Sequence, residues 1–319
     1  MPKPIVVAGF SPHYPGLIFL LIGGLFSLPG CLPPLPQHAY YVSPLNGNNT
    51  GYQPLPLQRD SAHSTFYAAG SFFTGSANEQ GTDYFNGGRV ALSAAHHYGM
   101  MQFFYGLDGT LGSYTLGTWR AGYVPAGILL PGLPTAPPAR SDLLNGYSGP
   151  KTFGSAGFHT GINGVIPVRG GEWRFLGVET SLSREFGDYL SLRRKLPDSL
   201  TSLTIRSPFF GTFGLSTELI GHTRHGEFGF RFFGGWVLGS DYRHLDVYDN
   251  IDARYLHYGY SGLSFHYTYD RYTGYMQLSD GEKAISFQVG LHYRLNRPRL
   301  PSKERPGEGR SPWRPIHVW

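Results

Sequence analysis

The stretch AISFQVGLHYRL, residues Ala284–Leu295, alternates between two kinds of side chain. Every second position is apolar: Ile285, Phe287, Val289, Leu291, Tyr293 and Leu295. The positions between them are small or polar: Ala284, Ser286, Gln288, Gly290, His292 and Arg294. Because successive side chains of a β-strand point to opposite faces, this pattern predicts a strand with one wholly apolar face. Its 12 residues also suit a tilted strand that crosses a bilayer, which needs about 9 to 11.

The same alternation recurs along the chain, for example over Met101–Leu107 and Leu263–Tyr269. It predicts ten strands, at residues 65–74, 86–97, 100–117, 152–165, 172–183, 205–221, 226–239, 256–269, 272–279 and 284–295. We therefore expect an all-β protein, a transmembrane, antiparallel, up-and-down β-barrel of about ten strands, with 8 or 12 as alternative counts. A soluble β-sandwich, which would turn its apolar faces inward, is the competing interpretation.

The connections between these strands also favour a barrel. Long and short connections tend to alternate, as they do in outer-membrane barrels, where turns are short on the periplasmic side and loops are long outside. An even number of strands then predicts that the segment before Ser64 and the tail after Leu295 both lie on the periplasmic side. Residues 118–151 would form the largest external loop, which covers the barrel mouth, fills the lumen or meets a partner.

The N-terminal part indicates export. Residues Gly16–Leu28 form an apolar run that is too short for a membrane-spanning helix and is typical of a signal peptide, which we assign to residues 1–30. The sequence Leu28-Pro29-Gly30-Cys31 resembles a bacterial lipobox, which implies lipidation of Cys31; an ordinary signal peptide with an incidental cysteine is the alternative. Residues 31–63 are rich in proline and predict a tether or a barrel plug, before a barrel at 64–295.

Charge and composition exclude some classes of partner. The formal net charge is +5, and basic residues crowd the C-terminal end, so we expect a basic, Pro-rich periplasmic tail at 296–319. No basic helix or zinc-ligand spacing occurs elsewhere, which argues against a nucleic-acid partner. The 22 Tyr and 22 Phe residues fit strands and interfacial aromatic girdles.

The predicted strand register places charged side chains inside the barrel. These lumen-facing residues are Arg89, Asp108, Glu179, Glu218, Arg231, His266, His292 and Arg294. Charges in a narrow lumen must pair or remain hydrated, and small barrels are largely filled by their own side chains. A structural, salt-bridged interior is the favoured interpretation, with a selective small-solute pore and a catalytic or proton-relay role as alternatives.

A short helix is expected in the connection from Arg184 to Thr204. Its apolar face would consist of Phe186, Tyr189, Leu190 and Leu192, and Arg193, Arg194 and Lys195 would end it favourably against the helix dipole. The helix is either a lid packed on the barrel rim or a docking element for a partner or for lipopolysaccharide phosphate.

The sequence contains only weak indications of metal binding or of catalysis. Asp241, Asp246, Asp249 and Asp252 are weak candidates for Ca²⁺ ligands, but they lack EF-hand spacing, so we expect no metal site and no cofactor. No nucleophile elbow or HExxH motif occurs, and His96, His97 and His159 are expected at the membrane interface. We therefore predict no enzyme, with an outer-membrane hydrolase as a less favoured alternative.

Two resemblances carry further implications. Gln288, Gly290, Tyr293 and Leu295 are spaced as in the β-signal of bacterial outer-membrane barrels, which implies recognition by the barrel insertion machinery. This sequence departs from that signal, because Leu295 replaces an aromatic residue and 24 residues follow it.

Over residues 40–295 the chain resembles outer-membrane barrels and lipoproteins of Bacteroidetes-type bacteria. The resemblance rests on YYVSPLNGN at 40–48, EWRFLGVETSLSREFGDYLSLRRK at 172–195 and ISFQVGLHYRL at 285–295. It implies a cell outer-membrane location, in contact with outer-membrane lipid and lipopolysaccharide, and it assigns no catalytic residue. We expect a structural or accessory component of an envelope complex, with a protein partner; a narrow small-solute channel is the alternative.

Overall fold

A computed structural model describes residues 40–57, 64–77, 83–117, 144–197, 203–223, 225–238, 259–281 and 284–296. These residues belong to one compact unit, Gln37–Trp319. Several predicted features lie outside the described residues: the signal peptide, Cys31, the loop residues Asp241, Asp246, Asp249 and Asp252, and residues 297–319 of the tail.

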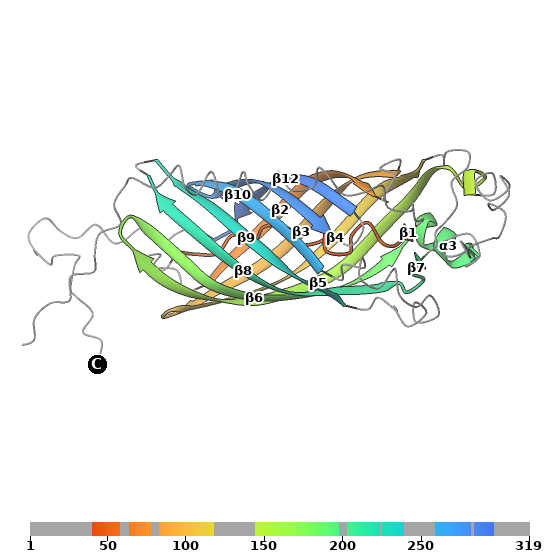
Figure 1. Ribbon diagram of the computed structural model, residues 1–319. Coiled ribbons are helices and arrows are strands. Elements are labelled where there is room, and N and C mark those ends of the chain that lie inside the picture. The colour runs from red at the N-terminus through yellow and green to blue at the C-terminus, as the bar shows by residue number, and fades with distance from the viewer. Residues whose placement is uncertain are drawn as a thin grey trace, which may run out of the picture. The chain divides into compact units, whose positions relative to one another are not determined.

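Ten antiparallel strands form a closed barrel (Figure 1). They are β2 Ser64–Ala77, β3 Asp83–Tyr98, β4 Met101–Leu116, β5 Gly149–Val168, β6 Gly171–Phe186, β8 Phe209–His222, β9 Glu227–Leu238, β10 Gly259–Tyr269, β11 Tyr272–Gly281 and β12 Ala284–Arg294. The barrel closes where β12 pairs with β2, with Val289 opposite Phe72. Each strand overlaps one of the ten predicted from alternation, so the predicted count and architecture are confirmed.

The barrel is apolar outside and polar inside. In β12, Phe287 and Val289 are 45% and 41% exposed, whereas Gln288 between them is 3% exposed. The same pattern holds around the wall, with Leu107 outside and Asp108 inside. A soluble sandwich would bury the apolar face, so this interpretation is excluded. An apolar exterior around a polar interior is the surface of an outer-membrane barrel, which confirms the predicted location.

The two ends of the barrel differ. At the short-turn end, β3 joins β4 through residues 99–100, β5 joins β6 through 169–170, and β10 joins β11 through 270–271. At the long-loop end, β4 is joined to β5, β6 to β8 and β9 to β10 by longer connections. β2 begins and β12 ends at the short-turn end. The ends are thus distinguishable by their connections, as the sequence predicted.

Small elements of secondary structure lie at the long-loop end. Helix α3, Asp188–Lys195, follows β6, and the two-residue strands β1, Tyr40–Tyr41, and β7, Leu203–Thr204, pair in parallel. The predicted short helix is therefore present. No helix in the described part of the chain is long and apolar enough to cross a membrane.

Phe186 was wrongly assigned to the apolar face of this helix. β6 continues to Phe186, and the strand alternation turns its side chain outward, where it is 47% exposed. Tyr189, Leu190 and Leu192 are buried as expected, and Arg193 is buried with them.

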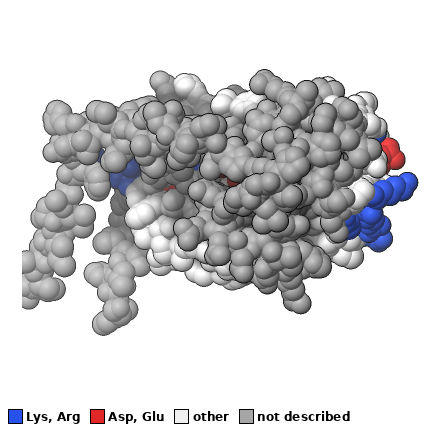
Figure 2. Space-filling view, turned by 45° about the vertical axis from the view of Figure 1, so that its right-hand side comes forward, with Lys and Arg blue, Asp and Glu red and all other residues white. Residues whose placement is uncertain are grey.

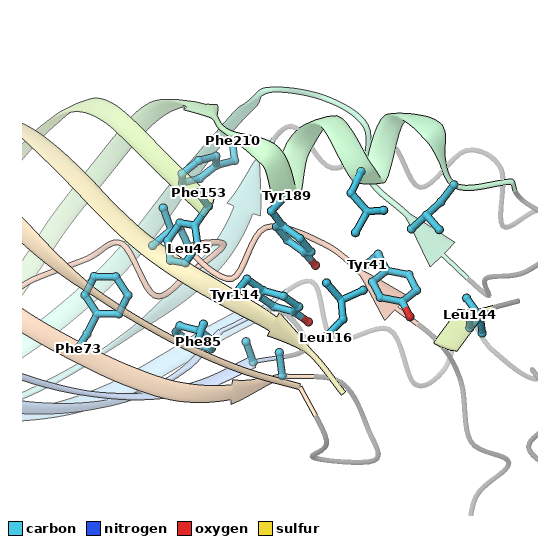
Figure 3. Close-up of a cluster of buried hydrophobic side chains, with 14 residues drawn as sticks. Tyr41, Leu45, Phe73, Phe85, Tyr114, Leu116, Leu144, Phe153, Tyr189 and Phe210 are labelled. Atoms are coloured by element: carbon cyan, nitrogen blue, oxygen red, sulfur yellow. The ribbon is translucent and has the colours of Figure 1, made fainter. Parts of the chain in front are cut away.

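A cluster of buried side chains closes the long-loop end (Figure 3). Tyr189 of α3 stacks on Tyr114 of β4, with ring centroids 4.0 Å apart. Tyr41 and Leu45, which precede the barrel in the sequence, belong to the same cluster as Phe73 and Phe85 of the wall. The helix is therefore packed on the barrel rim, and the chain around Tyr41 is packed beneath it.

Candidate functional site: the occupied lumen

A segment of the chain itself, residues 41–57, lies in the lumen and is called the lumen segment below (Figure 1). At the long-loop end, the backbone N–H of Ile205 donates to the Tyr41 carbonyl at 3.1 Å. Near the short-turn end, the Gln102 amide donates to the Pro56 carbonyl at 2.7 Å. The lumen segment thus crosses the barrel from one end to the other.

This direction bears on the expected position of the segment before Ser64. The sequence predicted that the segment before Ser64 lies at the periplasmic end together with the tail. Ser64 does lie at the short-turn end, where Asn296 donates to its carbonyl at 2.7 Å. Tyr41, however, lies at the opposite end, because the lumen segment between Tyr41 and Pro56 runs along the length of the barrel.

Wall side chains donate hydrogen bonds to backbone carbonyls of the lumen segment. Gln277 of β11 donates to the Thr50 carbonyl at 2.5 Å, and Arg174 of β6 donates to the Leu55 carbonyl at 3.1 Å. Residues 41–57 are buried, except Thr50, which is half-buried. Since an unpaired buried carbonyl is costly, these donors make the lumen a specific binding site for this segment.

Two asparagines tie the lumen segment to different walls. The Asn48 amide donates to the Ala284 carbonyl at 3.1 Å, and Ser286 of β12 donates to the Asn48 side-chain oxygen at 3.0 Å. The Asn49 amide lies 3.3 Å from the hydroxyl oxygens of both Ser181 and Ser183 of β6. The segment is therefore held between β6 and β12, which are far apart in sequence.

A turn before these asparagines requires glycine. Gly47 has φ +77°, and a Cβ there would lie 2.5 Å from the Cβ of Tyr260. The Asn49 N–H donates to the Leu45 carbonyl at 2.9 Å across this turn. Both the left-handed backbone and the wall exclude a side chain at this position.

Tyr52 contacts a charged cluster at the centre of the lumen. Its hydroxyl lies 3.0 Å from Nε2 of His266, and the two rings stack at 4.2 Å. The other ring nitrogen of His266 lies 3.4 Å from Glu218, which pairs with Arg174 at 2.5 Å. We call Tyr52, Arg174, Glu218 and His266 the central cluster. Arg174 links it back to the Leu55 carbonyl, so the lumen segment takes part in the network at two points.

Two more groups of charges lie inside the wall. Asp108 of β4 is 3.1 Å from Arg89 of β3 and 3.2 Å from His159 of β5. Arg231 of β9 is 2.6 Å from Glu179 of β6. His159 was expected at the membrane interface, but it is buried beside Asp108, because its strand alternation places it on the inner face.

The remaining predicted lumen residues are also buried. His292 is 1% exposed, with its ring centroid 5.2 Å from that of Tyr275, and Arg294 is 9% exposed near the short-turn end. Of the other two histidines expected at the interface, His96 is half-buried against Tyr105, and His97 is buried with its ring nitrogen 2.5 Å from the Gly99 carbonyl.

Five charged residues that are buried in the structure were not predicted to be so: Asp83, Glu172, Arg174 and Glu185 of the wall and Arg193 of α3. Arg174 was missed because the pairing register of β6 shifts between Arg174 and Gly177. Phe175 and Leu176 are both exposed there, which breaks the alternation. Residues before this point therefore face the opposite side of the wall from the one that the alternation after it predicts. Two consecutive apolar residues followed by Gly177 were the available signal.

Arg193 makes several contacts beneath helix α3. It pairs with Glu185 of β6, donates to the Ile205 carbonyl at 3.0 Å and lies 5.0 Å from the Tyr189 ring centroid. Burial raises the pKa of the Tyr189 phenol above its ordinary value. The phenol therefore stays neutral and donates to the Val42 carbonyl at 3.0 Å, which anchors the lumen segment to the helix.

The four residues of the insertion-signal motif lie on β12 and just after it. Gln288 is buried and donates to Ser71 at 2.7 Å and to Tyr275 at 2.9 Å. A Cβ at Gly290 would meet the Tyr275 ring at 2.3 Å. Tyr293 is half-buried and Leu295 is 50% exposed. Recognition by insertion machinery stays a prediction.

Among the described residues, a small cavity lies beside the lumen segment. One cavity lined by Asn49, Gly51, Arg89, His159 and Glu179 offers about 20 Å³ to the centre of a water-sized sphere. That is room for about one water molecule. Among the described residues, no group of three or more His, Cys, Asp or Glu side chains is arranged to hold a metal ion.

No protein-family model and no curated protein matches this chain. Among solved structures, it is similar to Neisserial surface protein A, at 11% identity over 73% of this chain and 96% of that chain, with a TM-score of 0.31. It is also similar to the translocator domain of the autotransporter NalP from Neisseria meningitidis, at 11% identity over 75% and 91% of the two chains and a TM-score of 0.35. The toluene transporter TodX from Pseudomonas putida matches at 8% identity over 81% and 95%, with a TM-score of 0.31. Matches at this level assign no activity to the chain.

Proposed function

We propose that this protein is a structural, non-conducting barrel of the outer membrane that carries its own N-terminal chain through its lumen. The lumen segment enters the barrel at the long-loop end and leaves at the short-turn end, where β2 begins. In outer-membrane barrels the long loops face outward. Tyr40 and Tyr41, the first described residues, would then lie at the outer mouth of the barrel, where we propose that the preceding chain meets another envelope component.

The observation that carries this proposal is the direction and fit of the lumen segment. Donors from β4, β6 and β11 bind its carbonyls, and Asn48 and Asn49 bind β12 and β6. A loosely held tether would not require donors on several strands. These contacts support a built-in part of the barrel rather than a transient occupant.

The alternative functions fit these contacts less well. A narrow channel would require the lumen segment to leave, at the loss of its hydrogen bonds and of the Tyr52–His266 contact. A hydrolase would need access to an acid–histidine pair, but Glu218–His266 lies beneath Tyr52. Asp108–His159 is buried beside Gly51 and Arg89.

Conductance in planar bilayers tests the sealed lumen. We expect the intact protein to give no sustained current, because the lumen segment and the paired charges fill the interior. A variant lacking residues 41–57 is expected to give reproducible current steps. A deletion of equal length from the tail, residues 298–314, is the matched control and should remain silent. A stable, ion-selective open state of the intact protein would favour the channel and contradict the proposal.

Surface labelling tests the direction of threading. A tag inserted after His38 is expected to bind antibody on intact cells, because the lumen segment opens toward the long-loop end. A tag near Ala136 in the largest long-loop connection should behave in the same way. A tag after Lys303 should need permeabilised cells. If the His38 tag needs permeabilisation while the Ala136 tag does not, the chain before Tyr40 does not emerge outside.

A further inference from the structure

The barrel rim beside α3 carries cationic side chains on its outer surface. We call this group the basic rim; it consists of Arg184, Arg194, Lys195 and Arg206. Figure 2 shows Lys and Arg side chains gathered at the end of the barrel that carries α3. Arg184, Arg194 and Lys195 are exposed, and Arg206 is half-buried.

Arg184 lies on the lipid-facing side of the wall. It belongs to the outward row of β6 between Leu182 and Phe186, which are 61% and 47% exposed. Its guanidinium lies 5.9 Å from the ring centroid of Phe209, which is itself 52% exposed. A cation at this point, above an apolar belt and close to the long-loop end, lies where acyl chains give way to headgroups.

Backbone contacts hold the other cations nearby. Arg194 Nε lies 3.4 Å from the Arg206 carbonyl, and Arg206 donates to the Leu196 carbonyl at 2.7 Å. Arg206 is only three residues before Phe209, over which Arg184 lies. Three residues span at most about 10 Å of backbone, so β6, α3 and the chain before β8 bring their cations to one stretch of the rim.

Nearby carboxylates only partly offset the positive charge of the basic rim. Glu185 is buried and pairs with Arg193, and Asp188 accepts a hydrogen bond from Thr152 at 2.6 Å. Within the described part of the chain, Arg184, Arg194 and Lys195 form no ion pair with a carboxylate. The basic rim therefore has a local excess of positive charge.

We propose that the basic rim binds the phosphate groups of a phosphorylated glycolipid in the outer leaflet. Arginine forks match phosphate oxygens, and cations from neighbouring elements on one stretch of the rim can meet one phosphorylated headgroup. The acyl chains of the same lipid would lie along Leu182, Phe186 and Phe209, which flank Arg184 on the exterior. Apolar and cationic contacts thus meet at one place on the wall.

The inference rests on the proposed function in one respect, because it requires the long-loop end to face the outer leaflet. Its test in detergent is independent of sidedness, so failure of lipid binding and failure of the labelling experiment are distinguishable. The probe is lipid A that carries both phosphates, compared with lipid A from which the phosphates have been removed and with inorganic phosphate alone. The measurement is the apparent Kd of the folded, full-length protein by native mass spectrometry.

The variant Arg184→Gln/Arg194→Gln is expected to weaken binding of phosphorylated lipid A roughly 30-fold, since it removes two interfacial cations that each contribute on the order of 1 kcal/mol. The matched control, Arg169→Gln/Arg271→Gln, removes two cations at the short-turn end and should leave the Kd unchanged. If the double variant does not fold, Arg194→Gln and Lys195→Gln on the exposed face of α3 replace it.

Three results would overturn the proposal. The first is an equal loss of affinity in the control pair, and the second is equal binding of dephosphorylated lipid A. The third is saturation of the protein by inorganic phosphate at the lipid concentrations used, which would indicate a site for free phosphate.

Discussion

Replacing Arg174 with alanine is expected to destabilise the folded barrel by about 3 to 5 kcal/mol, the usual cost of removing one partner from a buried ion pair. Arg174 and Glu218 lie inside the wall, 1% and 5% exposed, with 2.5 Å between them. Alanine would leave the Glu218 carboxylate buried without its main partner. It would also remove the donor to the Leu55 carbonyl, so the lumen segment would lose a wall contact.

The free energy of unfolding from urea titration in lipid or detergent, monitored by heat-modified gel mobility, measures this effect. The control is the double variant Arg174→Met/Glu218→Leu, which replaces both charges with apolar side chains of similar size. We expect it to lose less stability than the single variant, because no uncompensated charge remains. A single variant as stable as the native protein would show that the pair is hydrated rather than buried.

Replacing Val289 with arginine is expected to cost about 2 to 4 kcal/mol of folding free energy, as for a cation on the lipid face near the bilayer midplane. Val289 is the sixth of the 11 residues of β12 and is 41% exposed on the apolar exterior. An arginine there would have to leave headgroups and water for the hydrocarbon core. The same unfolding titration in lipid vesicles measures the loss.

Ile285→Arg is the matched control for this substitution. Ile285 lies on the same face of β12, one residue from its long-loop end, and is 53% exposed. Depth dependence predicts a cost of about 0 to 1 kcal/mol near the interface. Equal costs at both positions would contradict a lipid-facing exterior with its midplane near Val289.

The sequence by itself determined the wall of this barrel. Alternation is a local property that needs only neighbouring residues, so Ala284–Leu295 and its counterparts predicted ten strands and the face of the side chains in their regular parts. Connection lengths are equally local, and they separated the short-turn end from the long-loop end. The same alternation correctly predicted that Asp108, Glu218 and Arg231 face the lumen.

The inward and outward assignments made from alternation were wrong where the chain departs from an ideal strand. The register shift in β6 turns Phe175 and Leu176 outward together and moves Arg174 inside, so the partner of Glu218 was missed. At the end of the same strand, three more paired residues than expected carried Phe186 out of the helix and onto the exterior. Both errors arise because hydrogen-bond register depends on the neighbouring strands.

Only the tertiary structure decided what fills the lumen. Residues 41–57 have no periodic pattern, because their contacts come from all sides of the barrel rather than from one face. Their donors, Gln102, Arg174 and Gln277, lie 46, 119 and 227 residues away in the sequence. A local pattern carries no information on contacts at such separations. The direction of the lumen segment, and with it the proposed exit of the N-terminal chain, therefore becomes visible only when the ten strands have closed around it.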